Sequence, residues 1–292
     1  MKAPPFDYVR ARTLAHVFQL WAEAGPEARL LAGGQSLIAT LAMRLSEPSV
    51  LIDITRVPEL RGIRHLGNAL SLGALTTQAE LGTDPLVRQH APLFAEAVPL
   101  IAHPAIRNRG TLGGSLAFAD PAAELPACCV ALGATIVAVG ATGERRIPAR
   151  DFFQGLYATA LSANELIMAV EVPLAEPGEC STILELARRS GDYAMAGIVA
   201  RSQFEGNRLL DPQIVCFAVG DAPVVARGAM AQLADRPVQA AGIAAARAAL
   251  EQDLDPPADL NGGPAMKRHL ASVLLARAID RLVRRREAGE RA

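Results

Sequence analysis

The stretch "LAGGQSLIATL", residues 31–41, decides how this sequence is interpreted. Gly33 and Gly34 follow an apolar, strand-like stretch and precede a run with helical periodicity. A glycine pair at such a junction indicates either a backbone angle that only glycine adopts cheaply, or close approach of another group to the main chain. A second stretch of the same kind, "TLGGSLAFADPAAELPA", occupies residues 111–127. The two loops together raise the question of what approaches their backbones.

The composition limits the classes of protein to which this chain can belong. It has 292 residues, 51% of them hydrophobic and 4% aromatic, and a formal net charge of −1. The length suffices for two or three domains, while the charge and the few aromatic residues argue against nucleic-acid binding. No apolar run reaches the roughly 18–20 residues that cross a bilayer. The first residues also lack the apolar region of a signal peptide, so we expect a soluble, cytoplasmic protein without a transmembrane segment.

The cysteines and histidines do not form a metal-binding motif. The four cysteines are Cys128, Cys129, Cys180 and Cys216, and the five histidines show no HxH or HExxH arrangement. One adjacent pair of cysteines does not supply the spacing of a zinc or iron–sulfur site. We therefore expect no metal site here, and any iron–sulfur cluster that works with this chain must be held by another chain.

The predicted elements divide the chain near residues 57 and 176, into segments 1–57, which begins with a β-loop-α-β pattern, 58–175, and an α+β domain at 176–292. Thr13 and Ser36 are placed to cap the first two helices. Helices are expected at 13–24, 36–45, 77–101 with proline breaks, 124–133, 238–251 and 264–286. Strands are expected at 28–34, 50–54, 134–139, 165–173, 181–187, 196–204 and 214–220, with a hairpin at 62–74.

The two glycine loops predict an anion site. Each offers successive backbone N–H groups before a helix start, with hydroxyl groups nearby at Ser36, Thr111 and Ser115. Such a nest of N–H groups, with the positive end of a helix, attracts phosphate. Neither GxGxxG nor GxxxxGK[ST] occurs, so we expect a diphosphate site outside the Rossmann and P-loop folds. A single glycine pair is more often a simple turn, and the repetition is what favours a ligand.

The sequence resembles the FAD-binding medium subunits of the molybdenum hydroxylases, which include carbon monoxide dehydrogenase and xanthine dehydrogenase. The resemblance depends on "AGGQSL" (32–37), "RNRGTLGGSLAFADPAAELPA" (107–127) and "ARRSGDYAMAGIVA" (187–200), and it extends along the whole chain. It implies an α+β fold: a two-subdomain FAD-binding fold of the vanillyl-alcohol-oxidase type, then a C-terminal domain of the CO dehydrogenase flavoprotein type. It also implies two partners, a large molybdopterin-binding subunit and a small [2Fe–2S] subunit, in a dimer of heterotrimers.

The resemblance also assigns an FAD site, and no catalytic residue, to this chain. The segment 29–37 would surround the diphosphate, and Asp120 and Glu124 would accept hydrogen bonds from ribose or ribityl hydroxyls. Leu166 and Ile167 would pack against the flavin or adenine, and Tyr193 would approach the isoalloxazine ring. The full expected set is Arg29, Leu30, Leu31, Ala32, Gly33, Gly34, Gln35, Ser36, Leu37, Ile101, Gly110, Thr111, Gly114, Ser115, Ala117, Asp120, Ala123, Glu124, Leu166, Ile167 and Tyr193.

Several of these residues have a purely structural explanation as well. Asp120 precedes Pro121 and is suited to start a turn and cap a helix at 122–132, whose first turn Glu124 would favour electrostatically. A tyrosine such as Tyr193 is often simply a core or interface residue. Outside the site, Arg284–Arg286 is expected at the solvated C-terminal end of a helix.

The chain departs from its relatives at two positions. Gln35 stands where many relatives have histidine, and because both side chains form hydrogen bonds we expect FAD binding to persist. Glu185 stands where some relatives carry a lysine near the flavin. A carboxylate there would make reduction to an anionic flavin less favourable, which affects the flavin potential.

The implied function is electron transfer. FAD would collect electrons from [2Fe–2S] clusters of a partner and deliver them to a terminal acceptor, while the substrate is oxidised on the large subunit. One alternative is an independent FAD-dependent oxidoreductase with its own small substrate, but no histidine or lysine in the glycine motifs supplies its acid or base. The other is a docking scaffold that has lost FAD, against which the intact glycine pairs argue.

Overall fold

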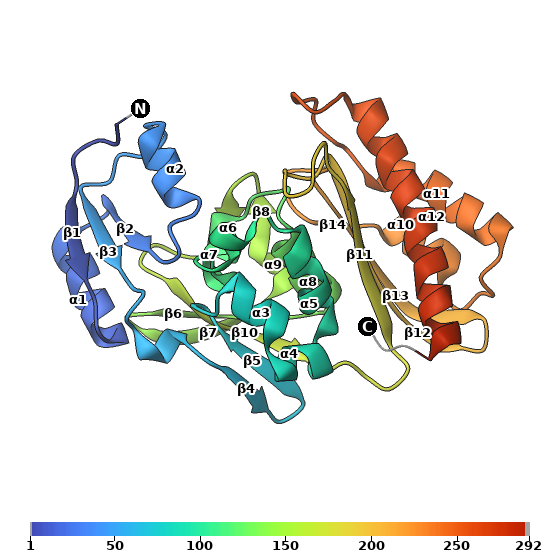
Figure 1. Ribbon diagram of the computed structural model, residues 1–292, viewed down its shortest axis with the longest axis horizontal. Helices are drawn as coiled ribbons and strands as arrows, with labels where there is room; N and C mark the ends of the chain where they lie inside the picture. The colour runs from blue at the N-terminus through green and yellow to red at the C-terminus, as the bar shows by residue number, and fades with distance from the viewer. Residues whose placement is uncertain (1, 290–292) are drawn as a thin grey trace.

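The computed structural model describes residues 2–289. Three bodies lie side by side along the long axis of the molecule, each built around its own sheet (Figure 1). We call them the N-terminal body (β1 to β3), the middle body (from the helix Pro58–Leu60 to β10) and the C-terminal body (β11 to α12). The mixture of helices with parallel and antiparallel strands confirms the expected α+β class.

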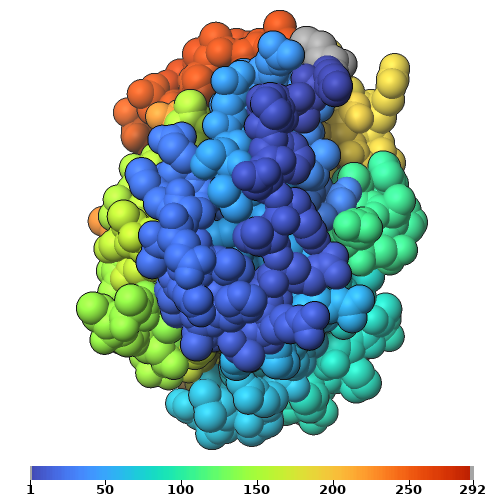
Figure 2. Space-filling model, turned by 90° about the vertical axis from the view of Figure 1, so that its left-hand side faces the viewer, coloured from blue at the N-terminus to red at the C-terminus, as the bar shows by residue number. Residues whose placement is uncertain are grey.

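The N-terminal body is a parallel three-stranded sheet with two helices, and it forms one end face of the molecule (Figure 2). Thr13 caps α1 as predicted, because its Oγ1 accepts the His16 N–H at 3.1 Å. The order across the sheet is β1-β3-β2. The elements are β1 (Asp7–Arg10), α1 (Leu14–Ala24), β2 (Ala28–Leu31), α2 (Leu37–Ala42) and β3 (Val50–Asp53).

The prediction that Ser36 caps α2 was wrong. Its side chain accepts no hydrogen bond from the helix, and its backbone lies in the helical region at φ −100° and ψ −50°. A capping residue needs an extended backbone to aim its side-chain oxygen at the first N–H groups of the helix. Here the chain already turns before Ser36, since the Ile38 N–H donates to the Gly34 carbonyl at 3.1 Å.

The middle body is an antiparallel sheet, ordered β4-β5-β10-β6-β7, with short helices on one face (Figure 1). The predicted hairpin is confirmed as β4 and β5, which meet at Gly67 with φ +59°. The strands are β4 (Ile63–Leu66), β5 (Ala69–Gly73), β6 (Thr135–Gly140), β7 (Gly143–Pro148) and β10 (Leu166–Pro173), with a small pair β8 (Phe153–Gly155) and β9 (Ala158–Thr159). The helices are α3 (Gln78–Thr83), α4 (Pro85–His90), α5 (Pro92–Ala97), α6 (Pro104–Arg107), α7 (Leu112–Phe118), α8 (Glu124–Ala131) and α9 (Ala149–Phe152).

The C-terminal body is an antiparallel sheet with helices on one face and the middle body on the other (Figure 1). Its strands are β11 (Cys180–Leu186), β12 (Ala196–Glu205), β13 (Arg208–Phe217) and β14 (Val224–Val225). Its helices are α10 (Arg227–Leu233), α11 (Ala240–Asp253) and α12 (Pro264–Ala288). β13 begins at Arg208, before the predicted start at residue 214, because it pairs with β12 from Glu205 onward across a tight turn.

Glu96 of α5 joins the middle and C-terminal bodies. Its carboxylate accepts from Arg285 of α12 at 2.7 Å and from the Thr182 hydroxyl at 3.0 Å, and Arg281 lies at 3.2 Å. The prediction of a solvated arginine run was therefore wrong for Arg285, whose side chain is 16% exposed. These charge-assisted contacts hold β11 and α12 of the C-terminal body against α5 of the middle body.

Candidate functional site

A cavity of about 980 Å³ separates the N-terminal and middle bodies and reaches the C-terminal body at Gly191–Tyr193. Of the residues expected at the FAD site, all but Leu31 line this cavity. Leu31 belongs to β2, where its carbonyl accepts the Ile54 N–H at 3.0 Å. A cavity of this size suits a large cofactor, and segments distant in sequence form its walls.

The first glycine loop provides the predicted nest of N–H groups. Gly34 has φ +74°, a conformation that favours glycine. Within residues 2–289, the backbone N–H groups of Gly34, Gln35 and Ser36 have no protein acceptor, and all three residues line the cavity. The Gln35 side chain holds the loop by donating to the Gly33 carbonyl at 2.9 Å. The loop therefore presents unpaired donors to a ligand.

The second glycine loop does not provide a nest, and that part of the prediction was wrong. The N–H groups of residues 112–115 donate within the protein, to the carbonyls of Thr76 and Ala74 and to both oxygens of Thr111. The reason is that Thr111 caps α7, so the amides that the sequence seemed to offer belong to the start of that helix. Ser115 and Thr111 both line the cavity, so their hydroxyl groups are polar groups that this side presents to a ligand.

What approaches Gly33 and Gly113 is another part of the same chain. A Cβ atom at Gly33 would lie 2.8 Å from the Arg109 carbonyl carbon, closer still to its oxygen, and 2.9 Å from the Gly110 Cα. A Cβ atom at Gly113 would lie 2.6 Å from the Cβ of Ala74. These glycines let the two loops and the end of β5 pack main chain against main chain. The cavity wall is therefore set by loop-to-loop contact.

Two carboxyl groups line one end of the cavity, which we call the Tyr193 end. This end comprises Asp120, Glu124 and Tyr193. Asp120 accepts the Ala122 N–H at 2.9 Å, and its carboxyl group interacts with the hydroxyl of Tyr193, which is 63% exposed at the rim. Ala123 occupies the N-cap position of the helix that follows and makes no side-chain hydrogen bond there, so Asp120 stabilises the turn but does not cap the helix. Burial, followed by the negative charge of Glu185, raises the pKa of Glu124 to about 8.

Several residues that line the cavity had no signal in the sequence. Trp21 reaches it from α1, His103 from the loop before α6, and Asn164 from the loop before β10. Gln78 of α3 also lines it, and its Oε1 is buried without a hydrogen-bond partner among residues 2–289. These residues lie outside the glycine motifs and reach the cavity only through packing of the bodies.

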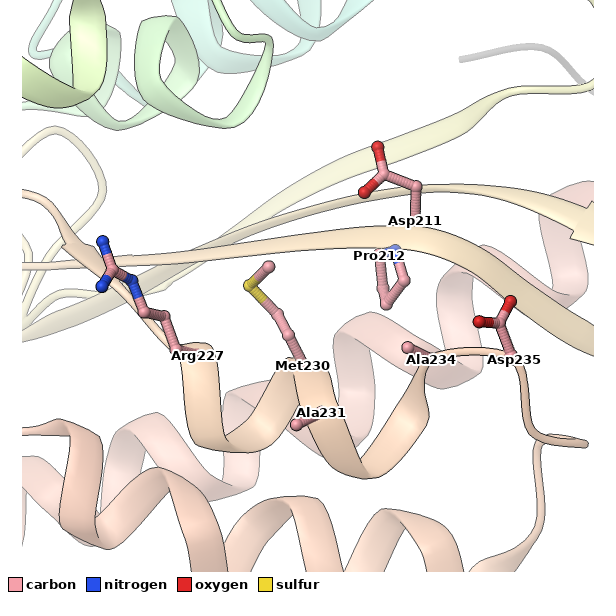
Figure 3. Close-up of a pocket in the computed structure, with 7 residues that line it drawn as sticks. All are labelled: Asp211, Pro212, Arg227, Met230, Ala231, Ala234 and Asp235. Atoms are coloured by element: carbon pink, nitrogen blue, oxygen red, sulfur yellow. The ribbon is translucent and has the colours of Figure 1, made fainter.

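A second hollow, of about 530 Å³, lies between β13 and α10 (Figure 3). Its residues are Asp211, Pro212, Arg227, Met230, Ala231, Ala234 and Asp235. Arg227 and Asp235 lie at opposite ends of α10, so the charged groups do not converge on one point (Figure 3). The larger cavity is therefore the candidate functional site.

Comparison with known proteins identifies the family. Residues 4–175 match the model of the FAD binding domain in molybdopterin dehydrogenase, and residues 181–282 match the CO dehydrogenase flavoprotein C-terminal domain. The chain belongs to the molybdopterin dehydrogenase flavoprotein family. The resemblance inferred from the glycine motifs is thereby confirmed, and so is FAD as the cofactor. The chain is a subunit of an oxidoreductase.

Relatives of this family match the chain over nearly its whole length. It is 38% identical to the alpha subunit of the 6-hydroxypseudooxynicotine dehydrogenase complex of Paenarthrobacter nicotinovorans, covering 98% of this chain and 97% of the relative. In the carbon monoxide dehydrogenase structure from Hydrogenophaga pseudoflava, one chain superimposes with a TM-score of 0.95 at 35% identity, covering 98% of this chain and 99% of that one. A chain of quinoline 2-oxidoreductase from Pseudomonas putida 86 superimposes with a TM-score of 0.93 at 37% identity. The match covers 97% of this chain and 99% of that one.

The described residues contain neither a metal-ligand cluster nor a membrane-spanning helix. Across residues 2–289, no group of three or more His, Cys, Asp or Glu side chains is arranged to hold a metal ion. None of the helices in that range combines the length and hydropathy needed to cross a bilayer.

Proposed function

We propose that this chain is the electron-transfer subunit of a molybdenum hydroxylase, in which FAD receives electrons from [2Fe–2S] clusters of a small partner and passes them to a terminal acceptor. The observation that supports this is the cavity between the bodies, with the unpaired N–H groups of residues 34–36 facing it. FAD supplies the redox chemistry when bound, because it exchanges electrons singly or in pairs. The protein's task is to bind and orient it.

The lining residues fit the parts of FAD. The N–H groups of residues 34–36 would bind the diphosphate, for which unpaired donors in a nest are suited. Leu166 and Ile167, both buried, would pack against an apolar ring face. The Tyr193 end would receive the isoalloxazine ring, where Asp120 orients the Tyr193 hydroxyl. No residue of this chain is assigned a catalytic role in substrate oxidation.

Exposed apolar side chains near both glycine loops support a role within a complex. Ile38, Met43 and Leu45 lie on and after α2 and are 47%, 49% and 72% exposed. At the other rim, Tyr157 is 54% exposed and its ring contacts Phe118, which lines the cavity, at 5.1 Å. Such patches are typical of surfaces that bind other proteins. We propose that they contact the small and large subunits, in a cytoplasmic dimer of heterotrimers.

One observation favours the alternative of an independent FAD-dependent oxidoreductase. Titratable side chains line the cavity, among them His103 and Glu124, and an enzyme with its own substrate needs an acid or base there. Expression of the chain alone separates the two functions. A subunit should be yellow and should accept electrons from dithionite, but it should not turn over purines, aldehydes, carbon monoxide or N-heterocycles. Sustained turnover by the isolated chain, free of molybdenum and iron, would show that it is an independent enzyme.

A further inference from the structure

The side chain of Gln78 is buried beside the cavity without a hydrogen bond. Gln78 is the first residue of α3, is 7% exposed and lines the cavity. Its Oε1 atom is enclosed and has no partner among residues 2–289. Its Nε2 atom makes no hydrogen bond in this range either, but it is not enclosed, so the nitrogen end of the amide is the accessible one. The hydroxyl group of Thr76 is also buried without a partner there, but Thr76 does not line the cavity.

A buried amide that forms no hydrogen bond needs an explanation. Burial removes the amide from water, and this cost is recovered only when another group replaces the lost hydrogen bonds. Such groups are uncommon in native proteins, and one that borders a cavity is a candidate contact for the ligand of that cavity. Gln78 therefore indicates a ligand group that accepts a hydrogen bond from Nε2.

Contacts with the second glycine motif fix the position of the amide. The backbone N–H of Gln78 donates to the Gly110 carbonyl at 2.8 Å, and the capping box of Thr77 and Glu80 holds the start of α3. A Cβ atom at Gly110 would lie 2.7 Å from the Oε1 atom of Gln78 and 3.2 Å from its Nε2 atom. The amide thus lies where a side chain at position 110 would be. Gly110 is in turn packed against Gly33, whose Cβ atom would lie 2.9 Å from the Gly110 Cα. The amide of Gln78 is therefore next to the contact between the two glycine loops.

The phosphates of FAD need donors beyond the first glycine loop. A diphosphate carries negative charge on several oxygens, and the unpaired N–H groups of residues 34–36 supply part of the donors. Within the described residues no lysine lines the cavity, and the Nη1 atom of Arg29 already donates to the carbonyls of Pro26 and Ala28, both at 2.9 Å. Neutral donors must therefore contribute, and hydrogen bonds to a charged acceptor are the stronger ones.

We propose that Gln78 is a further FAD-binding residue, which donates a hydrogen bond from Nε2 to an oxygen of the diphosphate. The inference rests on the proposed position of the diphosphate at residues 34–36. Without FAD the amide destabilises the chain, because its hydrogen bonds are missing, and FAD supplies the acceptor. A residue of this kind favours binding at the expense of the stability of the empty protein.

Gln78→Met tests the proposal through two measurements that should change in opposite directions. FAD should bind roughly ten- to hundredfold more weakly, as expected for loss of a hydrogen bond to a charged group. The thermal unfolding midpoint of the flavin-free chain should be unchanged or higher, because methionine has a similar shape and no unpaired polar atoms. A purely structural role of Gln78 predicts a lower midpoint. The matched control is Gln89→Met, at an exposed position of α4, which should change neither quantity. FAD affinity within about twofold of the wild type, or a lower midpoint of the flavin-free chain, would overturn the proposal.

Phosphorus NMR of bound FAD tests which part of the cofactor Gln78 contacts. At saturating FAD, Gln78→Met should shift at least one of the phosphorus resonances and leave the flavin absorption spectrum as in the wild type. Unchanged phosphorus resonances would overturn the assignment to the diphosphate.

Gln78→Glu tests whether the residue donates or accepts. A carboxylate cannot donate and repels phosphate, so this variant should bind FAD more weakly than Gln78→Met at neutral pH. Binding as tight as in the wild type would show that position 78 accepts from a hydroxyl group of FAD, and the donor role would be wrong. Failure of the wild type to bind FAD would refute the FAD site and the proposed function together, whereas normal FAD binding by Gln78→Met would refute this inference alone.

Discussion

Substitution of Gly33 by alanine is the most direct test of the loop-to-loop contact that shapes the cavity. The new methyl group would lie 2.8 Å from the Arg109 carbonyl carbon and 2.9 Å from the Gly110 Cα, where ordinary carbon contacts need roughly 3.5–4.0 Å. Both neighbours are backbone atoms, which cannot rotate away as a side chain can. The loops must therefore separate, and overpacking of this kind costs about 1–3 kcal/mol.

That cost has two measurable consequences. At roughly 2–4 °C per kcal/mol for a protein above 150 residues, the midpoint of thermal unfolding should fall by roughly 2–12 °C. Separation of the loops also displaces the donors of residues 34–36, and a loss of about 1.4 kcal/mol in binding would weaken FAD tenfold. The assays are thermal denaturation of the flavin-free chain and an FAD titration of the folded variant at low temperature.

Gly242→Ala is the matched control for this prediction. Gly242 lies in α11, and a Cβ atom there would meet no atom of residues 2–289 within 4 Å. The same chemical change should therefore be neutral or stabilising by up to about 1 kcal/mol, because alanine favours a helix more than glycine does. The reasoning is refuted if Gly33→Ala shows the same unfolding midpoint and FAD affinity as Gly242→Ala.

Three further predictions concern other parts of the molecule. Trp21 is the only tryptophan and lines the cavity, so FAD should quench the intrinsic fluorescence; an unchanged emission at saturating FAD would place the ligand elsewhere. The pKa of Glu124 is raised from 4.5 to about 8, so the free energy of unfolding should fall by about 5 kcal/mol as pH rises through this window. Glu124→Gln should abolish that fall, as measured by urea denaturation at several pH values. Glu96→Ala removes the acceptor of Arg285 and should destabilise the protein by about 2–3 kcal/mol in the same assay, whereas a loss below about 0.5 kcal/mol would show that the junction does not depend on it.

The sequence predicted the elements whose signals are local. The helix capped by Thr13 and the hairpin at Gly67 depend on residues within one or two turns of each other, and both are confirmed. Part of the cavity lining was also predictable, since the glycine motifs and the family resemblance name positions along the chain, whereas Trp21 and His103 gave no signal. The sequence of β1, "DYVR", has no apolar pattern that would predict a strand, because its residues are mostly exposed. It is a strand because it pairs with β3.

The predictions that failed depend on contacts between segments far apart in the chain. Arg285 lies in a charged run that is indistinguishable from a solvated helix end until Glu96, 189 positions earlier, is placed against it. The second glycine loop failed for a related reason. An N–H group is available to a ligand only if the protein itself supplies no acceptor for it. The N–H groups of Leu112 and Gly113 already donate to the carbonyls of Thr76 and Ala74 on the preceding segment.

The two glycine loops look equivalent in the sequence, but their glycines have different structural roles. Gly33 and Gly113 permit close packing of one backbone on another. Gly34 permits a left-handed turn that leaves three N–H groups without acceptors in the part of the chain that the structure describes. Only the last arrangement provides donors to a phosphate. A substitution at Gly33 should consequently affect both stability and FAD affinity, because it moves the wall of the cavity. A substitution that alters only the unpaired donors should affect FAD affinity alone, which separates the structural task of the motif from its binding task.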